Sequence, residues 1–556
     1  MLFTMHFNGD FFMIKRVIAV ILTVVLLVPL FSSCARGEGK DLFYPIYADP
    51  VSFDPQIASD NASKIVVYNC FEGLVRVDSD GKIIPGVATS WQISPDGLTY
   101  TFTLRSDAKW YMSEYAKKLL DSETAANFNY RVTAYDFVYG LRRAFNADMN
   151  PCADAGLYAI KNANEVYSKQ LPETALGVTA LNESTLKIEL TAPNSNFLKA
   201  LSTSAAMPCR KEFFEATKGR YGLDPETVIY NGPFYLYSWT LGSNLVLYKN
   251  ESYSGEKEVK PASINLYINS DYATRVEKLK DKTYDACPLS LNQKKLLEGE
   301  KKISYLNYSN ATWGFLFNCS STAMKNSDMR TALAYAVDVT KIQLPAHCNS
   351  YAKGIVPDIC FNGQTTYRNQ VGKVGNLAVN KEMAQEKLES ALKILDADYA
   401  KVKIICTKEF ENTVKMAIQS WQSVLGVKVS FVLEAYDETE FESILNLNEH
   451  DIAFAKVTAD SENVVSFLEM FNSTSEDSMV KYDSPVYNLL IESIKSEPNQ
   501  SKVLANCLAA EKHLISSGVF IPMFNEDSYL GLAKGVSGIY CVEAGTVPIF
   551  IDGIRK

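Results

Sequence analysis

The chain has 556 residues, a formal net charge of −9 and 21% charged residues. This length is too great for a single hydrophobic core and predicts two or three domains. The acidic balance and the lack of any run of Lys or Arg exclude nucleic acid from the expected partners.

An apolar run spans residues 17–31 and follows the basic pair Lys15 and Arg16. A basic segment before a short apolar stretch is typical of an export signal. At about 1.5 Å per residue, the run is too short to cross a ~30 Å hydrocarbon layer comfortably. We therefore expect residues 1–33 to be a signal peptide. Met13 is a candidate for the true start, because the residues before it add nothing that a signal needs.

The end of this run, FSSC at residues 31–34, resembles the lipobox of bacterial lipoproteins. In that class the cysteine sulfur receives a diacylglycerol group and the cysteine becomes the new N-terminus. The resemblance implies that Cys34 is lipidated and that residues 34–40 form a lipidated N-terminus and linker. Two acyl chains are enough for stable anchoring to a membrane. The alternative is an ordinary secretory signal that happens to contain Cys34.

Two segments in the first half of the chain have the pattern of strands. Residues 99–105 (TYTFTLR) and 184–191 (STLKIELT) alternate polar and apolar side chains. A period of two over seven or eight residues predicts half-buried strands.

In the second half, helical and strand patterns alternate. The expected elements are helices over residues 380–395 and 411–425 and strands over residues 401–407 and 427–433. The first helix carries Leu388, Ala391 and Leu392 on one face. The second ends at Gly426, which acts as a C-cap. This order predicts an α/β arrangement with right-handed crossovers.

Eleven cysteines are scattered along the chain, and no two have CxxC spacing. Those other than Cys34 could pair in an exported protein. They could equally be buried, small apolar residues. We expect most of them to be free thiols.

Several segments, taken in order, carry a family resemblance. They are FEGLVRVDSDGKIIPGVATSWQISPDGLTYTFTLRSDAKW (71–110), VTAYDFVYGLRRAF (132–145), NGPFYL (231–236), NSDMRTALAYAVDVTKI (326–342) and LGVKV (425–429). The ordered set resembles the family 5 extracellular solute-binding proteins, which are the oligopeptide- and dipeptide-binding components of ABC importers. The resemblance extends over nearly all of the mature chain.

The resemblance implies an α/β, two-lobed, periplasmic-binding-protein-like (type II) fold with a hinge and an additional α+β domain. Carried over by position, lobe one comprises residues 41–70, 196–310 and 525–556, the extra domain residues 71–195, and lobe two residues 311–524. Crossovers near Asn310 and Phe524 would form the hinge. The ligand would lie between the lobes and be buried when they close.

The function implied by the resemblance is that of a substrate-binding lipoprotein. It would capture extracellular peptides and deliver them to ABC permease subunits that work with separate ATPase subunits. We expect a monomer without a cofactor, held by its lipid on the outer face or the periplasmic side of the cell membrane. The alternatives are the same scaffold binding a non-peptide solute, a sensory or adhesive surface lipoprotein, and a secreted hydrolase.

The hydrolase is the weakest alternative, because the sequence has four His and no HExxH, GxSxG or P-loop motif. No metal site is predicted, since most of the 64 acidic residues are expected on a solvated surface. We therefore expect no catalysis.

The family holds peptides extended, as an added strand would be, and pairs the ligand ammonium with a buried carboxylate. In AKVTADSENVVSFL, Asp460 falls on that acid, and the main chain of Lys456 and Thr458 would flank the ligand. The alternative for Asp460 is a helix cap in a loop, where Asp is common, and without the resemblance the residue alone favours that alternative.

Other expected contacts are Trp313 in NATWGFLFN and the residues Ser59 and Asn61 in IASDNAS. The alternatives are a core aromatic and a simple surface loop.

The chain also departs from the family pattern. Two positions that hold cysteines in the best-known oligopeptide binders are Ala311 and Thr458 here, so that disulfide is missing. Two arginines that can meet a peptide carboxylate fall on Leu445 and Phe454, and Lys456 is a candidate to replace that charge. Residues 111–131 are longer than the turn usual at that place.

Overall fold

The structure is a computed structural model. It describes residues 39–149, 151, 153, 155–194, 196–300, 302–346, 348–362, 365–459, 462–473, 478–497 and 499–556. The predicted signal peptide, Cys34 and Asp460 lie outside the described residues. Among the residues that are described, no helix is both long and apolar enough to cross a membrane.

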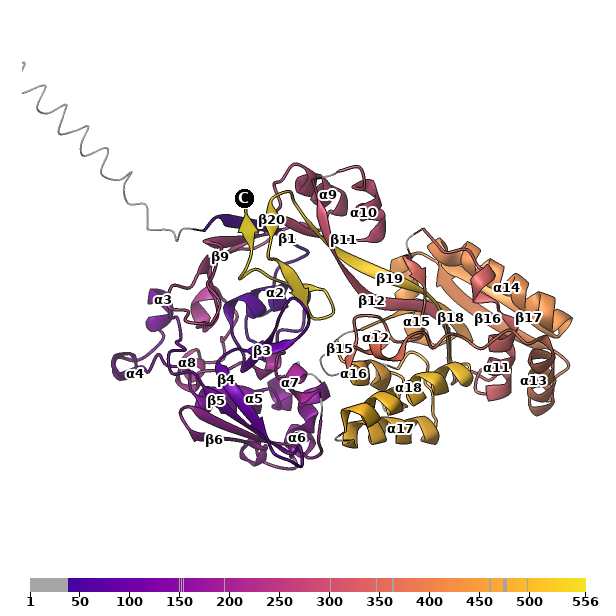
Figure 1. The fold of residues 1–556 in the computed structure, drawn as a ribbon, viewed down its shortest axis with the longest axis horizontal. Helices are drawn as coiled ribbons and strands as arrows, with labels where there is room; N and C mark the ends of the chain where they lie inside the picture. The colour runs from indigo at the N-terminus through magenta and orange to yellow at the C-terminus, as the bar shows by residue number, and fades with distance from the viewer. Residues whose placement is uncertain are drawn as a thin grey trace, which may run out of the picture.

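The N-terminal half is built on two four-stranded sheets, drawn in indigo and magenta in Figure 1. The first has the order β1 (Asp41–Ile46), β10 (Ser263–Ile268), β9 (Asn244–Lys249) and β8 (Phe234–Thr240). The second is antiparallel, with the order β4 (Ala88–Ile93), β5 (Thr99–Leu104), β7 (Thr185–Glu189) and β6 (Val178–Asn182). The two strands predicted from alternation are therefore confirmed as β5 and β7.

Helices of this half pack against the sheets. The main ones are α2 (Asn61–Cys70), α5 (Ala134–Arg143), α7 (Phe197–Ala200) and α8 (Lys211–Ala216). On α5, Phe137 and Leu141 are fully buried. A hydrogen-bonded ion pair between Arg143 and Asp54, both almost fully buried, fixes α5 to the segment before α2. One continuous apolar cluster therefore runs through both sheets.

Two long strands connect the halves of the molecule. β12 (Ser304–Phe317) and β19 (Phe520–Leu532) pair antiparallel along nearly their whole length. Figure 1 shows them running from the top of the N-terminal half into the orange half on the right. Their register shifts between Ser309 and Ala311 and again between Trp313 and Gly314. Such irregularities disrupt the ladder and bend the strand pair locally.

The right-hand half is built on the continuation of these strands. The sheet that these strands extend into this half has the order β11 (Ala286–Leu289, at the N-terminal-half end), β19, β12, β18 (Ile452–Thr458), β16 (Ala400–Thr407) and β17 (Val429–Tyr436), and β13 (Ser350–Tyr351) also pairs with β19. β16 pairs parallel with both β17 and β18. Helices cover both faces, so the central strands are apolar almost throughout.

The covering helices of this half include both predicted ones. They are α11 (Ser327–Ala336), α13 (Lys381–Ile394), α14 (Glu411–Leu425), α15 (Glu438–Leu447), α16 (Val464–Glu469), α17 (Pro485–Ser496) and α18 (Gln500–Ser516). Gly426 ends α14 with φ +64°, as expected for a C-cap.

The predicted start of the strand after α14 is wrong. Residues Gly426–Lys428 form a single 3₁₀ turn, in which Val427 is 96% exposed. β17 therefore begins at Val429 and continues to Tyr436.

The cysteine prediction agrees with the described part of the chain. Its cysteines are all buried free thiols: Cys70, Cys209, Cys287, Cys319, Cys348, Cys360, Cys406, Cys507 and Cys541. Burial raises the pKa of Cys287, Cys507 and Cys541 to about 12. These thiols therefore stay protonated and unreactive at neutral pH.

Candidate functional site

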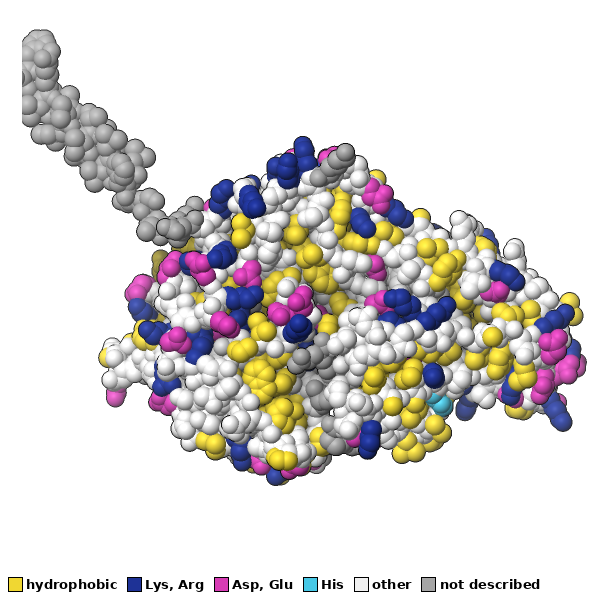
Figure 2. Space-filling view, viewed as in Figure 1, with side chains coloured by type: hydrophobic (Ala, Val, Ile, Leu, Met, Phe, Trp, Pro, Cys, Tyr) yellow, Lys and Arg dark blue, Asp and Glu magenta, His cyan; other side chains and the backbone are white. Residues whose placement is uncertain are grey.

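The two halves face each other below the β12–β19 strand pair in the view of Figure 1, and pockets there define a cleft between them. In the view of Figure 2, charged side chains of both signs lie across the middle of the molecule, where the halves approach each other. Several pockets take residues from both halves, and two of them lie on either side of the end of β18.

One edge of β18 is open where it enters the cleft. β18 pairs with β12 from Ile452 to Thr458, but with β16 only from Ile452 to Phe454. Residues 455–458 therefore have no strand neighbour on the β16 side among the described residues. An open edge presents backbone N–H and C=O groups that an extended chain can pair with.

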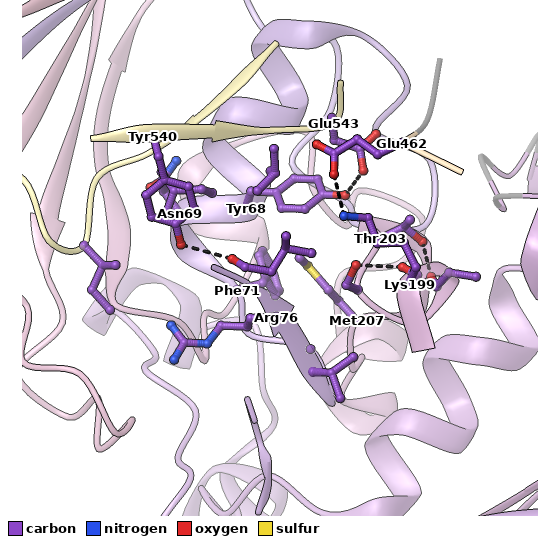
Figure 3. Close-up of a pocket in the computed structure, with 18 of the residues that line it drawn as sticks. Tyr68, Asn69, Phe71, Arg76, Lys199, Thr203, Met207, Glu462, Tyr540 and Glu543 are labelled. Carbon is purple, nitrogen blue, oxygen red and sulfur yellow. Dashed lines mark hydrogen bonds and ion pairs between the residues drawn. The ribbon is translucent and has the colours of Figure 1, made fainter. Parts of the chain in front are cut away.

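The first pocket, shown in Figure 3, is called the enclosed pocket here. Its apolar walls are Phe71, Val75, Val77, Met207, Tyr540, Val542, Ile549 and Ile551, and its rim is Tyr68, Lys199, Glu462 and Glu543. Burial raises the pKa of Tyr540 to about 12, so this wall carries no charge at neutral pH.

An ion pair joins the two halves at this rim. Lys199, on α7, contacts the Glu462 carboxylate, and their side chains are 20% and 6% exposed. Glu462 stands just before α16, whose N-cap is Asn463. The Glu462 carbonyl also accepts a hydrogen bond from the Phe361 N–H at 2.7 Å. The Lys199 ammonium lies 5.3 Å from the centre of the Phe361 ring, so Phe361 supports both members of the pair.

A tight turn holds the other rim carboxylate. It joins β21 (Tyr540–Val542) to β22 (Val547–Ile549), and Glu543, Ala544 and Gly545 all have positive φ. The Glu543 carboxylate accepts hydrogen bonds from the Tyr68 hydroxyl and from Lys64.

Hydrogen bonds fix this turn to the start of α2 and to β12. The Asn61 side chain donates to the Thr546 carbonyl at 3.0 Å, and the Asn310 side chain donates to the Ala544 carbonyl at 3.2 Å. Left-handed backbone at Glu543 and Ala544, which are not glycines, is unfavourable and persists only where surrounding contacts hold it. The turn is therefore a rigid part of the cleft wall.

The second pocket, called the open pocket here, lies at the carboxyl ends of β16 and β17. It is lined by residues 290–292 at the start of α10 (Leu291–Leu296), by residues 407–409 and 436–438, and by Trp313, Lys456 and Glu526. In this lining, acidic side chains outnumber basic ones four to two. Ligands of α/β sheets commonly bind outside the carboxyl ends of strands.

Trp313, Lys456 and Glu526 form one cluster in the open pocket. Trp313 and Lys456 are register partners on β12 and β18. The Trp313 Nε1–H and the Lys456 ammonium both donate to the Glu526 carboxylate, the latter at 3.1 Å. Lys456 was predicted to replace the charge of the missing arginines. Its ammonium is instead neutralised by the Glu526 carboxylate.

The structure places the remaining predicted residues as follows. Thr458 is half-buried at the end of β18, directly opposite Ala311 in the ladder. These two cysteine-replacing positions are thus neighbours. Ser59 is exposed, and Asn61 begins α2 and binds the turn described above. Phe454 is fully buried among Trp313, Phe315 and Phe410, so no charge stands there.

Sequence reasoning missed Lys199, Glu462, Glu543 and Tyr68. Glu462 lies two residues after the predicted acid Asp460, and that segment was a usable signal. Nothing local marks Lys199 or Glu543, because their partners are 263 and 475 residues away in the chain.

The chain is similar in sequence to proteins of one known family. The family model for bacterial extracellular solute-binding proteins, family 5 Middle, matches residues 82–479, which is most of the chain. The chain belongs to this family. The oligopeptide-binding protein AmiA of Streptococcus pneumoniae is 27% identical over 91% of this chain and 88% of its own. The Bacillus subtilis oligopeptide-binding protein OppA is 26% identical over 90% of this chain and 92% of its own.

Solved structures show the same fold. The Haemophilus influenzae OppA complex with the peptide RPPGFSPFR has a TM-score of 0.69 at 22% identity, covering 93% of this chain and 99% of that one. Listeria monocytogenes OppA bound to peptide has a TM-score of 0.68 at 22% identity, covering 94% and 100%. The predicted fold class, a two-lobed type II binding-protein fold with an additional α+β domain, is confirmed.

Proposed function

We propose that this family 5 protein is the peptide-binding component of an ABC importer. The observation that carries the proposal is the open edge of β18 at residues 455–458, which lies between two pockets at the junction of the halves. A peptide can add to this edge as a strand, using main-chain hydrogen bonds that do not depend on its sequence. Its side chains then project alternately to either side.

Closure completes the site. The rim pair Lys199–Glu462 joins the halves only when they are together, and the bulged β12–β19 pair provides a place to bend. We assign residues 41–70, 196–310 and 525–556 to lobe one, 71–195 to the extra domain and 311–524 to lobe two. Peptide binding and lobe closure are then one linked equilibrium.

The ligand ends need partners of opposite charge, because an unpaired buried charge is strongly unfavourable. We assign Asp460 as the carboxylate that pairs with the peptide ammonium. The preceding residue, Ala459, donates its N–H to the Asn310 carbonyl at 2.9 Å. The main chain of Lys456 and Thr458 flanks the ligand. Trp313, Ser59 and Asn61 line the cleft beside it.

The protein is also proposed to be a monomeric lipoprotein held at Cys34 on the outer face or the periplasmic side of the cell membrane. It would pass its cargo, unchanged, to permease subunits driven by separate ATPases. Because Cys34 carries the acyl chains, Cys34→Ala should move the protein from the membrane fraction to the soluble fraction. Membrane retention of this variant after fractionation would contradict the anchor.

Mass spectrometry of material released from the denatured protein tests the substrate class. We expect peptides, and we expect added peptides to be recovered intact after long incubation. Recovery of a non-peptide solute would keep the scaffold and change the substrate. Cleaved peptides would overturn the proposal that the protein only binds.

A further inference from the structure

The enclosed pocket differs from the open pocket in its chemistry. Its apolar walls are Phe71, just after α2, residues of β2 (Val75–Val77), β21 and β22, Ile551, and Met207. Figure 3 shows the labelled Phe71, Met207 and Tyr540 around the hollow, with the charged groups Lys199, Glu462 and Glu543 gathered on one side. The pocket thus has an apolar interior and a charged rim.

The charges of the rim are already paired. Lys199 pairs with Glu462, and Glu543 receives hydrogen bonds from Tyr68 and Lys64. Arg76, which also lines the pocket, lies 3.2 Å from the Glu72 carboxylate, which Arg105 contacts at 2.6 Å. A charged group entering the pocket would lose its hydration and meet side chains that already have ionic partners, whereas an apolar group would gain by leaving water.

The pocket belongs to the ligand cleft. Glu462 and Asn463 come from the segment after β18, while the other lining residues come from residues 68–77, 199–207 and 233 and from the C-terminal residues 540–551. The Ala459 N–H and the Ala544 carbonyl both bind Asn310, which ties the end of the open β18 edge to the turn that carries Glu543. A peptide on that edge therefore passes the rim, and one of its side chains can point inward.

We propose that the enclosed pocket is a specificity pocket that takes one bulky apolar side chain of the bound peptide, either aromatic or branched aliphatic. The inference rests on the proposed peptide-binding function. It gives this protein a preference at one ligand position that main-chain recognition alone would not provide.

Gly73 offers a way to fill the pocket. A Cβ added there would meet the Val75 carbonyl at 3.4 Å, the Leu201 carbonyl at 3.6 Å and the Met207 Cγ at 4.0 Å, all ordinary contacts. Gly73→Ala therefore fits the backbone, and Gly73→Leu extends further toward Met207. Gly299, whose added Cβ would meet no atom of the structure within 4 Å, provides the matched control Gly299→Leu.

The test measures binding of trialanine and of variants carrying one Phe, Leu, Asp or Lys at each position, by calorimetry. We expect one position at which Phe or Leu binds about tenfold or more tightly than Ala, and at which Asp and Lys bind less tightly than Ala. Gly73→Leu should abolish this preference and leave trialanine within about threefold of its original affinity. Gly73→Ala should reduce the preference partly, and Gly299→Leu should keep it.

The possible failures are distinguishable. Peptide binding without an apolar preference at any position, or equal losses for all peptides in both Gly73 variants, would overturn the specificity pocket and leave the peptide-binding function standing. No binding of any peptide by the original protein would overturn the proposed function and this inference with it.

Discussion

The two ends of the interlobe cleft both carry a Lys–Glu ion pair beside an aromatic ring, but in different surroundings. At the enclosed pocket, Lys199 and Glu462 are 20% and 6% exposed and come from opposite halves. At the open pocket, Lys456 and Glu526 are 40% and 30% exposed and stand on β18 and β19 of one continuous sheet, beside the proposed crossover near Phe524. The first pair breaks when the halves separate and can therefore report on closure, whereas the second pair lies within one sheet and mainly affects the local cleft surface.

The largest expected effect concerns the ligand ammonium near the enclosed end. Asp460→Ala should weaken binding of free peptides by about 3 kcal/mol or more, roughly a hundredfold, because it leaves a buried ammonium unpaired. N-acetylated peptides lack that charge and should lose little. Calorimetry with matched free and acetylated peptides measures the difference, and equal losses for both would remove Asp460 from this role.

A smaller effect is expected from the pair that joins the halves. Lys199→Met leaves Glu462 without its cation, and opening of the cleft lets water reach the carboxylate. We expect peptide affinity to fall by about 1–3 kcal/mol and the ligand-free protein to become more extended in X-ray scattering. Glu462→Gln combined with Lys199→Met should restore part of the loss.

Lys211→Met is the matched control for Lys199→Met. Lys211 pairs with Glu215 on α8, and both side chains are about 60% exposed. This variant should leave affinity and scattering unchanged. If Lys199→Met behaves like Lys211→Met, the enclosed pair plays no part in closure.

At the open end, Trp313→Phe removes the N–H that binds Glu526 but keeps a ring beside Phe410 and Phe454. A hydrogen bond at a partly exposed site contributes modestly, so the free energy of unfolding should fall by about 1 kcal/mol. Urea denaturation gives the value. A loss above about 3 kcal/mol would mean that ring packing, and not the hydrogen bond, dominates at this position.

The smallest effect is expected for the open ion pair itself. A double-mutant cycle with Lys456→Ala and Glu526→Ala should give a coupling of about 0.2–1 kcal/mol in urea unfolding. In 1 M NaCl, where the Debye length is about 3 Å, the coupling should nearly vanish. A coupling that resists salt would show this end to be as enclosed as the other.

Sequence patterns could predict the parts of the molecule that depend on neighbouring residues. The alternation in β5 and β7 and the apolar faces of α13 and α14 identified these elements, because burial imposes a period of two or 3.6. Gly426 marked a helix end for the same local reason. The start of β17 was misplaced because Val427, apolar but 96% exposed, was read as a strand residue.

The site was only partly predictable. The resemblance directed attention to Trp313 and Lys456, which the structure brings together, but not to Glu526, which binds both. Lys199, Glu543 and Tyr68 become cleft residues only when distant segments meet. No spacing rule encodes contacts that span several hundred residues.

The central claim is that a peptide adds to the open edge of β18 as the halves close around it. Amide hydrogen exchange over residues 455–458, with and without a bound tripeptide, tests it most directly. Exchange in this segment should slow strongly when the peptide binds, because its backbone groups gain partners and lose contact with water. Peptide binding that leaves exchange at residues 455–458 unchanged would contradict it.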